Sequence, residues 1–305
     1  MPDIKTSRNT RHRSLRSIVN FQHGVFLWLQ HQRGYSGSFP TGGSAMTGSL
    51  MGIPVDLGFT NGGVLSSRSI MLPELSALLS VAPADADMRG YQRLAVDEDA
   101  LGKASAANRE KTFGMLRRLY ALNPEVPIFR EFRRLSLLFP SERETMAGIL
   151  ALAREPLLRA CSDMVLGAPI NSPLSRESFE VWVREFAAGR FSEAMYRSFS
   201  HNLYASFFQM GYLGEAVAKC RLRQRRDIRP ATVAYAAFLD WLKGLNGVSL
   251  LQGSFSRSLE LAKADHLSLL SAAGQLGLMQ VANSGGVLQL DFASWLQPGE
   301  ARLST

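Results

Sequence analysis

Apolar residues recur at helical spacing along most of this chain. In residues 69–81, four apolar residues fall at i, i+4, i+7 and i+8, the spacing of one buried helix face. They are Met71, Leu75, Leu78 and Leu79. Comparable stripes predict helices over residues 105–122, 127–139, 142–166, 175–188, 193–210, 233–242 and 265–274. The pattern therefore predicts a mainly α fold.

Residues at the ends of these segments support the predicted helices. Ser105, Ser175 and Asp265 are good N-caps, because their side-chain oxygens can accept a backbone N–H of the first turn. Pro156 predicts a kink or break in the segment 142–166. We expect the acidic residues within 85–99 to form a solvated loop rather than a metal site. The pair Gly62 and Gly63 permits positive φ and predicts a tight turn, with a phosphate-cradling loop as the alternative.

After Leu213 the pattern changes to strict alternation. Four cations alternate with smaller or apolar residues, and we call them the basic comb: Lys219, Arg221, Arg223 and Arg225. In an extended strand they share one face, with Cys220 and Leu222 packing inward. A turn at residues 224–227 and a return strand at 228–230 would complete a two-stranded wing after a helix. This predicts helical modules of winged-helix type.

A second hairpin is predicted near the end of the chain. Residues 278–282 and 287–292 flank the turn Asn283-Ser284-Gly285-Gly286, and Leu288, Leu290 and Phe292 share its inner face. No Lys or Arg occurs between Lys263 and Arg302. We expect the basic wing to touch DNA and the uncharged one to pack on its own module or on another protein.

The net charge of +8 is unevenly distributed along the 305 residues. Residues 1–50 hold six cations against one acid, so the remaining 255 residues carry only +3. We expect residues 1–50 to be a basic, Gly/Ser-containing extension that is disordered, or not translated if Met46 or Met51 is the true start. The predicted modules are residues 51–166 (helical), 167–232 (helical with the basic wing) and 233–305 (winged-helix-like).

Several classes of function lack support in the composition. Cys161 and Cys220 form no CxxC pattern, which argues against a thiolate zinc site and fits a reduced cytoplasm. No apolar run approaches the roughly 20 residues of a membrane-spanning helix, so we expect a soluble protein without a membrane partner. Nucleophile, metal-protease, Walker A and dinucleotide motifs are missing from the sequence. We expect no enzyme activity, no cofactor and no metal.

One segment carries a family resemblance. A Phe-Thr-x-Gly-Gly-hydrophobic sequence begins at Phe59, and a leucine-rich helix and a Ser-Ala-x-x-x-Arg helix ending in Arg-Arg-Leu follow it. With the Met-Gly-Tyr-Leu element at residues 210–213, this order resembles the BrxA family of BREX phage-defence systems over residues 56–230. The resemblance implies a helical, non-catalytic protein that binds DNA and is similar in fold to the antitermination factor NusB.

Cations in three places are candidates for binding DNA. They are Lys111 and Arg118; Arg130, Arg133 and Arg134; and the comb with its neighbours, namely Lys219, Arg221, Arg223, Arg225, Arg226 and Arg229. Regularly spaced charges meet phosphates without selecting sequence, and four such contacts predict a log-log salt slope near −3.6, at about −0.9 each. The first hypothesis is therefore a nonspecific double-stranded DNA-binding accessory protein that works with other BREX proteins. The alternatives are solvated helix faces, a charged edge strand, and a protein-protein assembly subunit without DNA contact.

Overall fold

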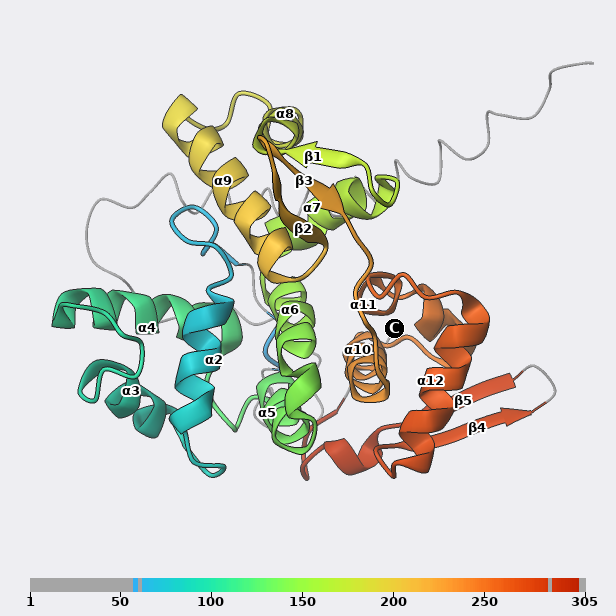
Figure 1. Ribbon diagram of the computed structural model, residues 1–305. Helices are drawn as coiled ribbons and strands as arrows, with labels where there is room; N and C mark the ends of the chain where they lie inside the picture. The colour runs from blue at the N-terminus through green and yellow to red at the C-terminus, as the bar shows by residue number, and fades with distance from the viewer. Residues whose placement is uncertain (1–56, 60–61, 285–286, 302–305) are drawn as a thin grey trace, which may run out of the picture. The chain divides into compact units, whose positions relative to one another are not determined.

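The computed structural model describes residues 57–59, 62–284 and 287–301 of the chain (Figure 1). The predicted extension at residues 1–50 lies outside this range. The fold is mainly helical with small antiparallel sheets, which confirms the predicted fold class at that level.

Five helices make up the first half of the described chain: α2 (Leu72–Val81), α3 (Met88–Val96), α4 (Ala106–Tyr120), α5 (Pro127–Leu138) and α6 (Arg143–Arg154), with a 3-10 turn η2 (Pro140–Glu142) before the last. The Ser105 cap is confirmed, since its side chain accepts a hydrogen bond from the Asn108 N–H. Helix α3 was not predicted. Its N-cap is Asp87, one of the acidic residues that we had assigned to a loop.

Helix α6 lies at the centre of this half. Every residue from Met146 to Arg154 is buried, and neighbouring helices α2, α4, α5 and α10 surround it. Alanines and Gly148 on its surface let the neighbours approach closely; the Met210 side chain lies where a Cβ on Gly148 would meet it at 3.2 Å. Pro156 separates α6 from the next helix, as predicted, because it cannot donate the backbone hydrogen bond that would continue α6.

The Gly-Gly motif forms a turn around a buried carboxylate. Gly62 and Gly63 both have positive φ, and Glu155 accepts hydrogen bonds from the N–H groups of Gly63 and Val64 at 2.9 and 3.0 Å. A Cβ on Gly62 would lie 2.4 Å from the Glu155 carboxylate. The predicted tight turn is confirmed. The anion that its amides hold is an internal one.

The next elements form a module that we call the wing module: α7 (Pro156–Gly167), β1 (Pro173–Ser175), α8 (Arg176–Phe186), α9 (Glu193–Gln209), β2 (Leu213–Val217) and β3 (Cys220–Arg223). The sheet has three strands in the order β1-β3-β2, all antiparallel. Ser175 caps α8 as predicted. Strand β1, absent from the prediction, pairs Ser175 with Cys220 and so places the start of α8 beside β3.

The last part, which we call the C-terminal module, contains α10 (Pro230–Leu242), η3 (Gly247–Gln252), α11 (Ser254–Arg257), α12 (Lys263–Gln275), β4 (Gln280–Ser284), β5 (Val287–Asp291) and η4 (Ala293–Trp295). The predicted hairpin is confirmed, with Leu288, Leu290 and Phe292 buried. The prediction that Asp265 is the N-cap of α12 was wrong. The helix begins two residues earlier, and Asp265 lies in its first turn.

Candidate nucleic-acid interface

The basic comb does not form one exposed row. Only Arg221 and Arg223 lie in strand β3; Lys219 lies in the β2–β3 turn and Arg225 follows the strand. Leu222, expected inside, is 38% exposed, whereas Arg223, expected outside, is fully buried. The alternation was correct but the assignment of faces was wrong, because β3 is the middle strand and its Arg223 face packs against the protein. The predicted turn at 224–227 and return strand at 228–230 are also wrong, since the hairpin turns at Ala218.

The buried Arg223 side chain is held by other groups of the protein. Its guanidinium donates to the carbonyl of Val165 at 2.8 Å, lies 5.3 Å from the ring of Tyr212, and forms an ion pair with Glu260. Its Nη1 donates to the carbonyls of Tyr212 and Gln224. A buried charge needs such partners to offset its desolvation. Arg223 therefore joins the wing module to the C-terminal module and is not available to DNA.

Arg221 attaches the hairpin to helix α9. Its guanidinium lies 3.5 Å from the ring centroid of Phe208 and 5.7 Å from that of Tyr204. It also donates to the Gly214 carbonyl at 2.8 Å, and its side chain remains 18% exposed. A cation over aromatic faces is attracted by the ring quadrupole. Arg221 thus sets the position of the hairpin, and at the surface it pairs with the exposed Glu215 carboxylate at 3.8 Å.

Helix α9 has one exposed face. Its opposite faces bury Tyr196, Phe199, Leu203 and Phe207. Arg197 and His201, one turn apart, project from the exposed face, and Tyr204 lies half-buried beside them. Both Arg197 and His201 are exposed, and Arg197, one turn after Glu193, helps to lower the pKa of that carboxyl.

Cations from three elements surround this face. Arg176 begins α8 next to β3, and both Arg221 and Arg176 act on Tyr204: burial raises the pKa of this phenol, and the two arginines oppose that rise. Lys219 is exposed at the hairpin turn. We call this surface the wing interface; its members are Arg176, Arg197, His201, Tyr204, Lys219 and Arg221. Lys219 and Arg221 were predicted, but the other four were missed.

A signal for the missed residues exists in the sequence. Arg197 and His201 are the polar residues at i and i+4 within an otherwise aromatic helix, which marks its solvent side. Arg176 and Tyr204 carry no such signal. The pairing of β1 with β3 places Arg176 beside the hairpin, and the position of Arg221 over α9 does the same for Tyr204.

The cations that follow β3 lie in a mixed-charge pocket. Arg225, Arg226 and Arg229 line a cavity of about 290 Å³ together with Glu142, Glu144 and Asp227. Arg229 pairs with Asp227 at 2.8 Å, and Arg226 stacks 4.1 Å from the ring of Tyr212 while donating to its hydroxyl. The charges of this pocket therefore balance one another, and it offers a polyanion little attraction.

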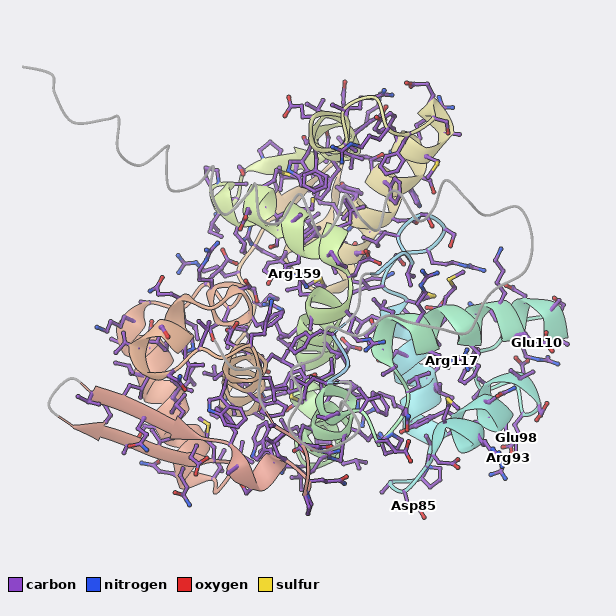
Figure 2. All side chains as sticks on the ribbon, turned by 180° about the vertical axis from the view of Figure 1, so that it is seen from behind. Asp85, Arg93, Glu98, Glu110, Arg117 and Arg159 are labelled. Atoms are coloured by element: carbon purple, nitrogen blue, oxygen red, sulfur yellow. The ribbon has the colours of Figure 1, made fainter. Side chains whose placement is uncertain are left out.

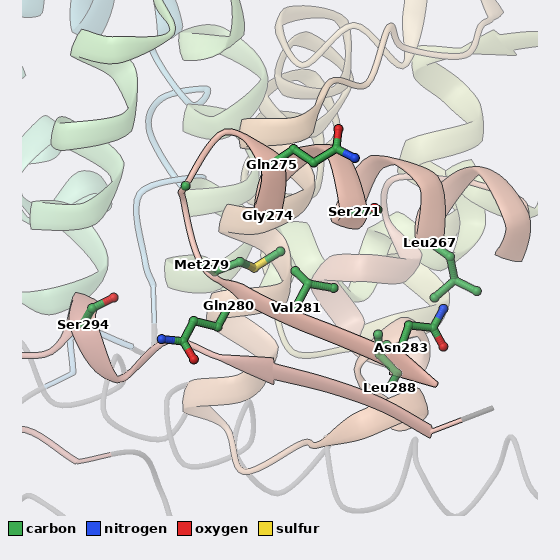
Figure 3. Close-up of a pocket in the computed structure, with 11 residues that line it drawn as sticks. Leu267, Ser271, Gly274, Gln275, Met279, Gln280, Val281, Asn283, Leu288 and Ser294 are labelled. Carbon is green, nitrogen blue, oxygen red and sulfur yellow. The ribbon is translucent and has the colours of Figure 1, made fainter. Parts of the chain in front are cut away.

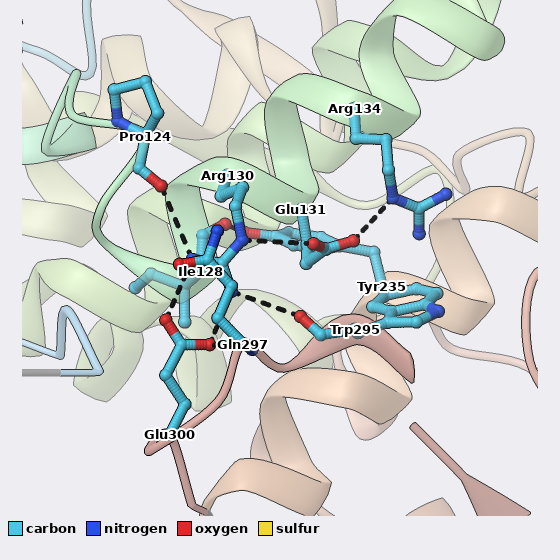
Figure 4. A network of polar contacts seen from close by, with 9 residues as sticks. All are labelled: Pro124, Ile128, Arg130, Glu131, Arg134, Tyr235, Trp295, Gln297 and Glu300. Atoms are coloured by element: carbon cyan, nitrogen blue, oxygen red, sulfur yellow. Dashed lines mark hydrogen bonds and ion pairs between the residues drawn. The ribbon is translucent and has the colours of Figure 1, made fainter. Parts of the chain in front are cut away.

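The basic arc predicted on α5 is not an exposed face. Arg133 is buried and donates to the carbonyls of Leu79, Ala82 and Pro83, at the end of α2. Figure 4 shows Arg130 held by the Glu300 carboxylate and the Trp295 carbonyl, and Arg134 bonded to Glu131. Both the DNA-binding and the solvated interpretations are therefore wrong for Arg130 and Arg133. These arginines hold α2 and the chain end on α5.

Helix α4 keeps its predicted cations at the surface. Lys111 is exposed, and Arg118 is exposed while its Nε donates to the Gly62 carbonyl at 3.0 Å. Figure 2 labels two further exposed residues of this helix, Glu110 and Arg117.

The second hairpin borders an uncharged groove. A cavity of about 930 Å³ lies between α12 and β4, lined by Leu267, Ser271, Gln275, Val281, Asn283 and Leu288 among others (Figure 3). Its polar groups are amides and hydroxyls, which carry no net charge. The groove therefore gives no electrostatic attraction to a phosphate backbone.

Other kinds of site receive no support from the described residues. Within them, no helix is long and apolar enough to cross a bilayer, and no group of His, Cys, Asp and Glu is arranged to hold a metal ion. In comparisons with known proteins, no protein-family model matches this chain, and no curated protein matches it either.

Proposed function

We propose that this chain binds double-stranded DNA through the wing interface, as a non-catalytic accessory protein of a BREX-type antiviral defence system. The defence context comes from the resemblance to the BrxA family. The DNA-binding part rests on one observation: exposed cations from α8, α9 and the hairpin turn, Arg176, Arg197 and Lys219, surround a single exposed helix face.

The order of elements supports this proposal. The wing module has the order of elements that is typical of winged-helix modules. Along the chain a helix, a strand and two helices precede the hairpin, and in the sheet the last strand, β3, lies between β1 and β2. In such modules the second helix of the pair enters the major groove and its N-terminal residues reach base edges. Arg197 lies in the N-terminal half of α9 and His201 at its midpoint, and Arg221 lies over Phe208 in the C-terminal half. The NusB-like arrangement of the preceding helices stays a prediction from the resemblance.

A salt titration with nonspecific duplex tests the proposal. Four cations of the wing interface predict a log-log slope near −3.6, at about −0.9 per phosphate contact. Replacing Arg197 and Lys219 by Ala should move the slope to about −1.8 and weaken binding at low salt. The matched control replaces Arg89 and Lys263, two exposed cations outside the interface, and removes the same charge. Equal losses in both double variants would show that net charge alone, not this surface, attracts DNA.

The second candidate function is a protein-protein assembly subunit. The groove beside β4 favours it, since a concave surface without cations cannot neutralise the phosphates of a nucleic acid, whereas a polypeptide does not require them. Stable co-purification with other defence proteins, without a gel shift, would favour this role.

A further inference from the structure

We propose that duplex DNA bound at the wing interface continues over the motif loop, residues 62–68, onto one edge of helix α4, where Lys111 and Arg118 meet its phosphates. This inference rests on the proposed function. It adds a second contact surface, formed by residues more than fifty positions away from the wing interface in sequence.

The motif loop connects α9 to α4 by direct hydrogen bonds. On the α9 side, Ser198 Oγ donates to the Ser66 carbonyl at 2.8 Å, and Asn202 Nδ2 donates to the Leu65 carbonyl at 2.8 Å. Ser198 is the neighbour of Arg197, so the loop borders the exposed face of α9. In Figure 1 the loop, drawn in blue, runs beside α9.

The same loop lies along α4. Arg68 Nη2 donates to Asn108 Oδ1 at 3.1 Å near the start of the helix, and Arg118 Nε donates to the Gly62 carbonyl at 3.0 Å near its end. The loop therefore spans about ten residues of α4, or about 15 Å at 1.5 Å per residue. The Glu155 carboxylate holds its Gly63 end in place.

Lys111 lies on the edge of α4 that faces the loop. At about 100° per residue, it projects within roughly 60° of Asn108 and 20° of Arg118, the two residues that contact the loop. Arg117 projects about 120° from Lys111, toward Glu110 on the far side. Cations thus continue from Arg197 across Arg68 to Lys111 and Arg118. Duplex DNA, with one charge per about 1.7 Å, is the partner of complementary charge.

The experiment compares two duplex lengths and two charge reversals on the same helix. A 12-bp duplex spans about 40 Å, enough for one recognition helix and its wing, whereas a 30-bp duplex can extend to α4. Lys111→Glu should weaken binding of the 30-bp duplex about tenfold and that of the 12-bp duplex less than twofold. Arg117→Glu is the matched control, since it is exposed on α4 and changes the charge equally; it should alter both affinities less than twofold.

The outcomes separate this inference from the proposed function. If the wild type binds both duplexes and Lys111→Glu behaves like Arg117→Glu, the α4 contact is excluded and the wing interface is unaffected. If the wild type binds neither duplex, both proposals fail. Lys111→Gln serves as a second variant, and it should give a smaller loss with the same dependence on duplex length.

Discussion

The two hairpins of this protein have similar shapes and different surroundings. Each follows a helix, β2–β3 after α9 and β4–β5 after α12. Cations surround the first, but residues 264–301 around the second contain no Lys or Arg. The difference teaches that a shared arrangement of helix and hairpin does not imply a shared ligand, because the side chains at the exposed face determine what it attracts.

The comparison extends to their buried groups. Each hairpin is preceded by a helix that contains a histidine. His201 of α9 is exposed, whereas His266 of α12 is buried, and its Nε2 has no partner among the described residues. One surface is available for a ligand, whereas the other helix contributes an uncharged group to its core.

The largest effect is expected for a substitution that removes the contact between the wing module and the C-terminal module. Arg223→Met should destabilise the protein by about 3–5 kcal/mol, because it leaves the Glu260 carboxylate without its buried partner. Urea unfolding of the variant and the wild type measures this change. Arg225→Ala, an exposed change two residues later, should stay within about 0.5 kcal/mol. A similar small effect for both variants would contradict the structural role of Arg223.

A second prediction concerns His266. Burial lowers its pKa to about 4, so its contribution to stability is present above pH 6.5 and is lost as the pH falls toward 4. As the pH falls from 6.5 to 4, the free energy of unfolding of His266→Leu should therefore rise relative to that of the wild type, by at most roughly 3 kcal/mol. Thermal unfolding at several pH values checks it. If the difference in unfolding free energy between the two proteins is the same at every pH, His266 does not have a lowered pKa.

Asp240 in the same module acts in the opposite direction. Burial raises its pKa to about 6, with partial compensation from the Ser256 N–H, so its contribution is present below pH 3.8 and lost as the pH rises through 6. Because the two contributions oppose each other, the stability of the wild type should depend less on pH than it would with His266 or Asp240 alone. The comparison of His266→Leu with the wild type at each pH removes this background.

The smallest effect sharpens the role of charge. Ser271→Arg and Asn283→Lys place two cations beside the uncharged groove, on α12 and on β4 (Figure 3). In a background lacking Arg197 and Lys219, this double graft should steepen the salt slope of DNA binding by up to about 1.8. Binding that stays unchanged would mean that the shape of the C-terminal module, not only its charge, excludes DNA.

The helices were largely predictable because each depends on a local pattern. Apolar spacing located α4, α5, α8 and α9, and the caps at Ser105 and Ser175 were correct to the residue. Helix α3 was missed because its acidic flanks suggested a loop, although Asp87 is its N-cap. Short-range hydrogen bonds and helix periodicity are properties of neighbouring residues, so they leave a mark on the sequence.

The roles of the arginines were not predictable in this way. Arg221 and Arg223 have the same spacing and residue type, yet one stacks on Phe208 at the surface and the other is buried with Glu260. Arg130 and Arg118 are both helix arginines, but Glu300, which holds the first, lies 170 residues away in sequence. Charge patterning identifies cations and says nothing about distant acids and carbonyls.

By itself, the sequence determined the helical class, the second hairpin, the alternation along β3 and the uneven distribution of charge. Only the tertiary structure decided which cations remain at the surface, because strand β1 made β3 a central strand and so buried one side of the comb. It also brought Arg176, Arg197 and Lys219 around one helix face, from three elements that local patterns cannot relate. Burial depends on which distant segments pack together, and no short stretch of sequence contains that information.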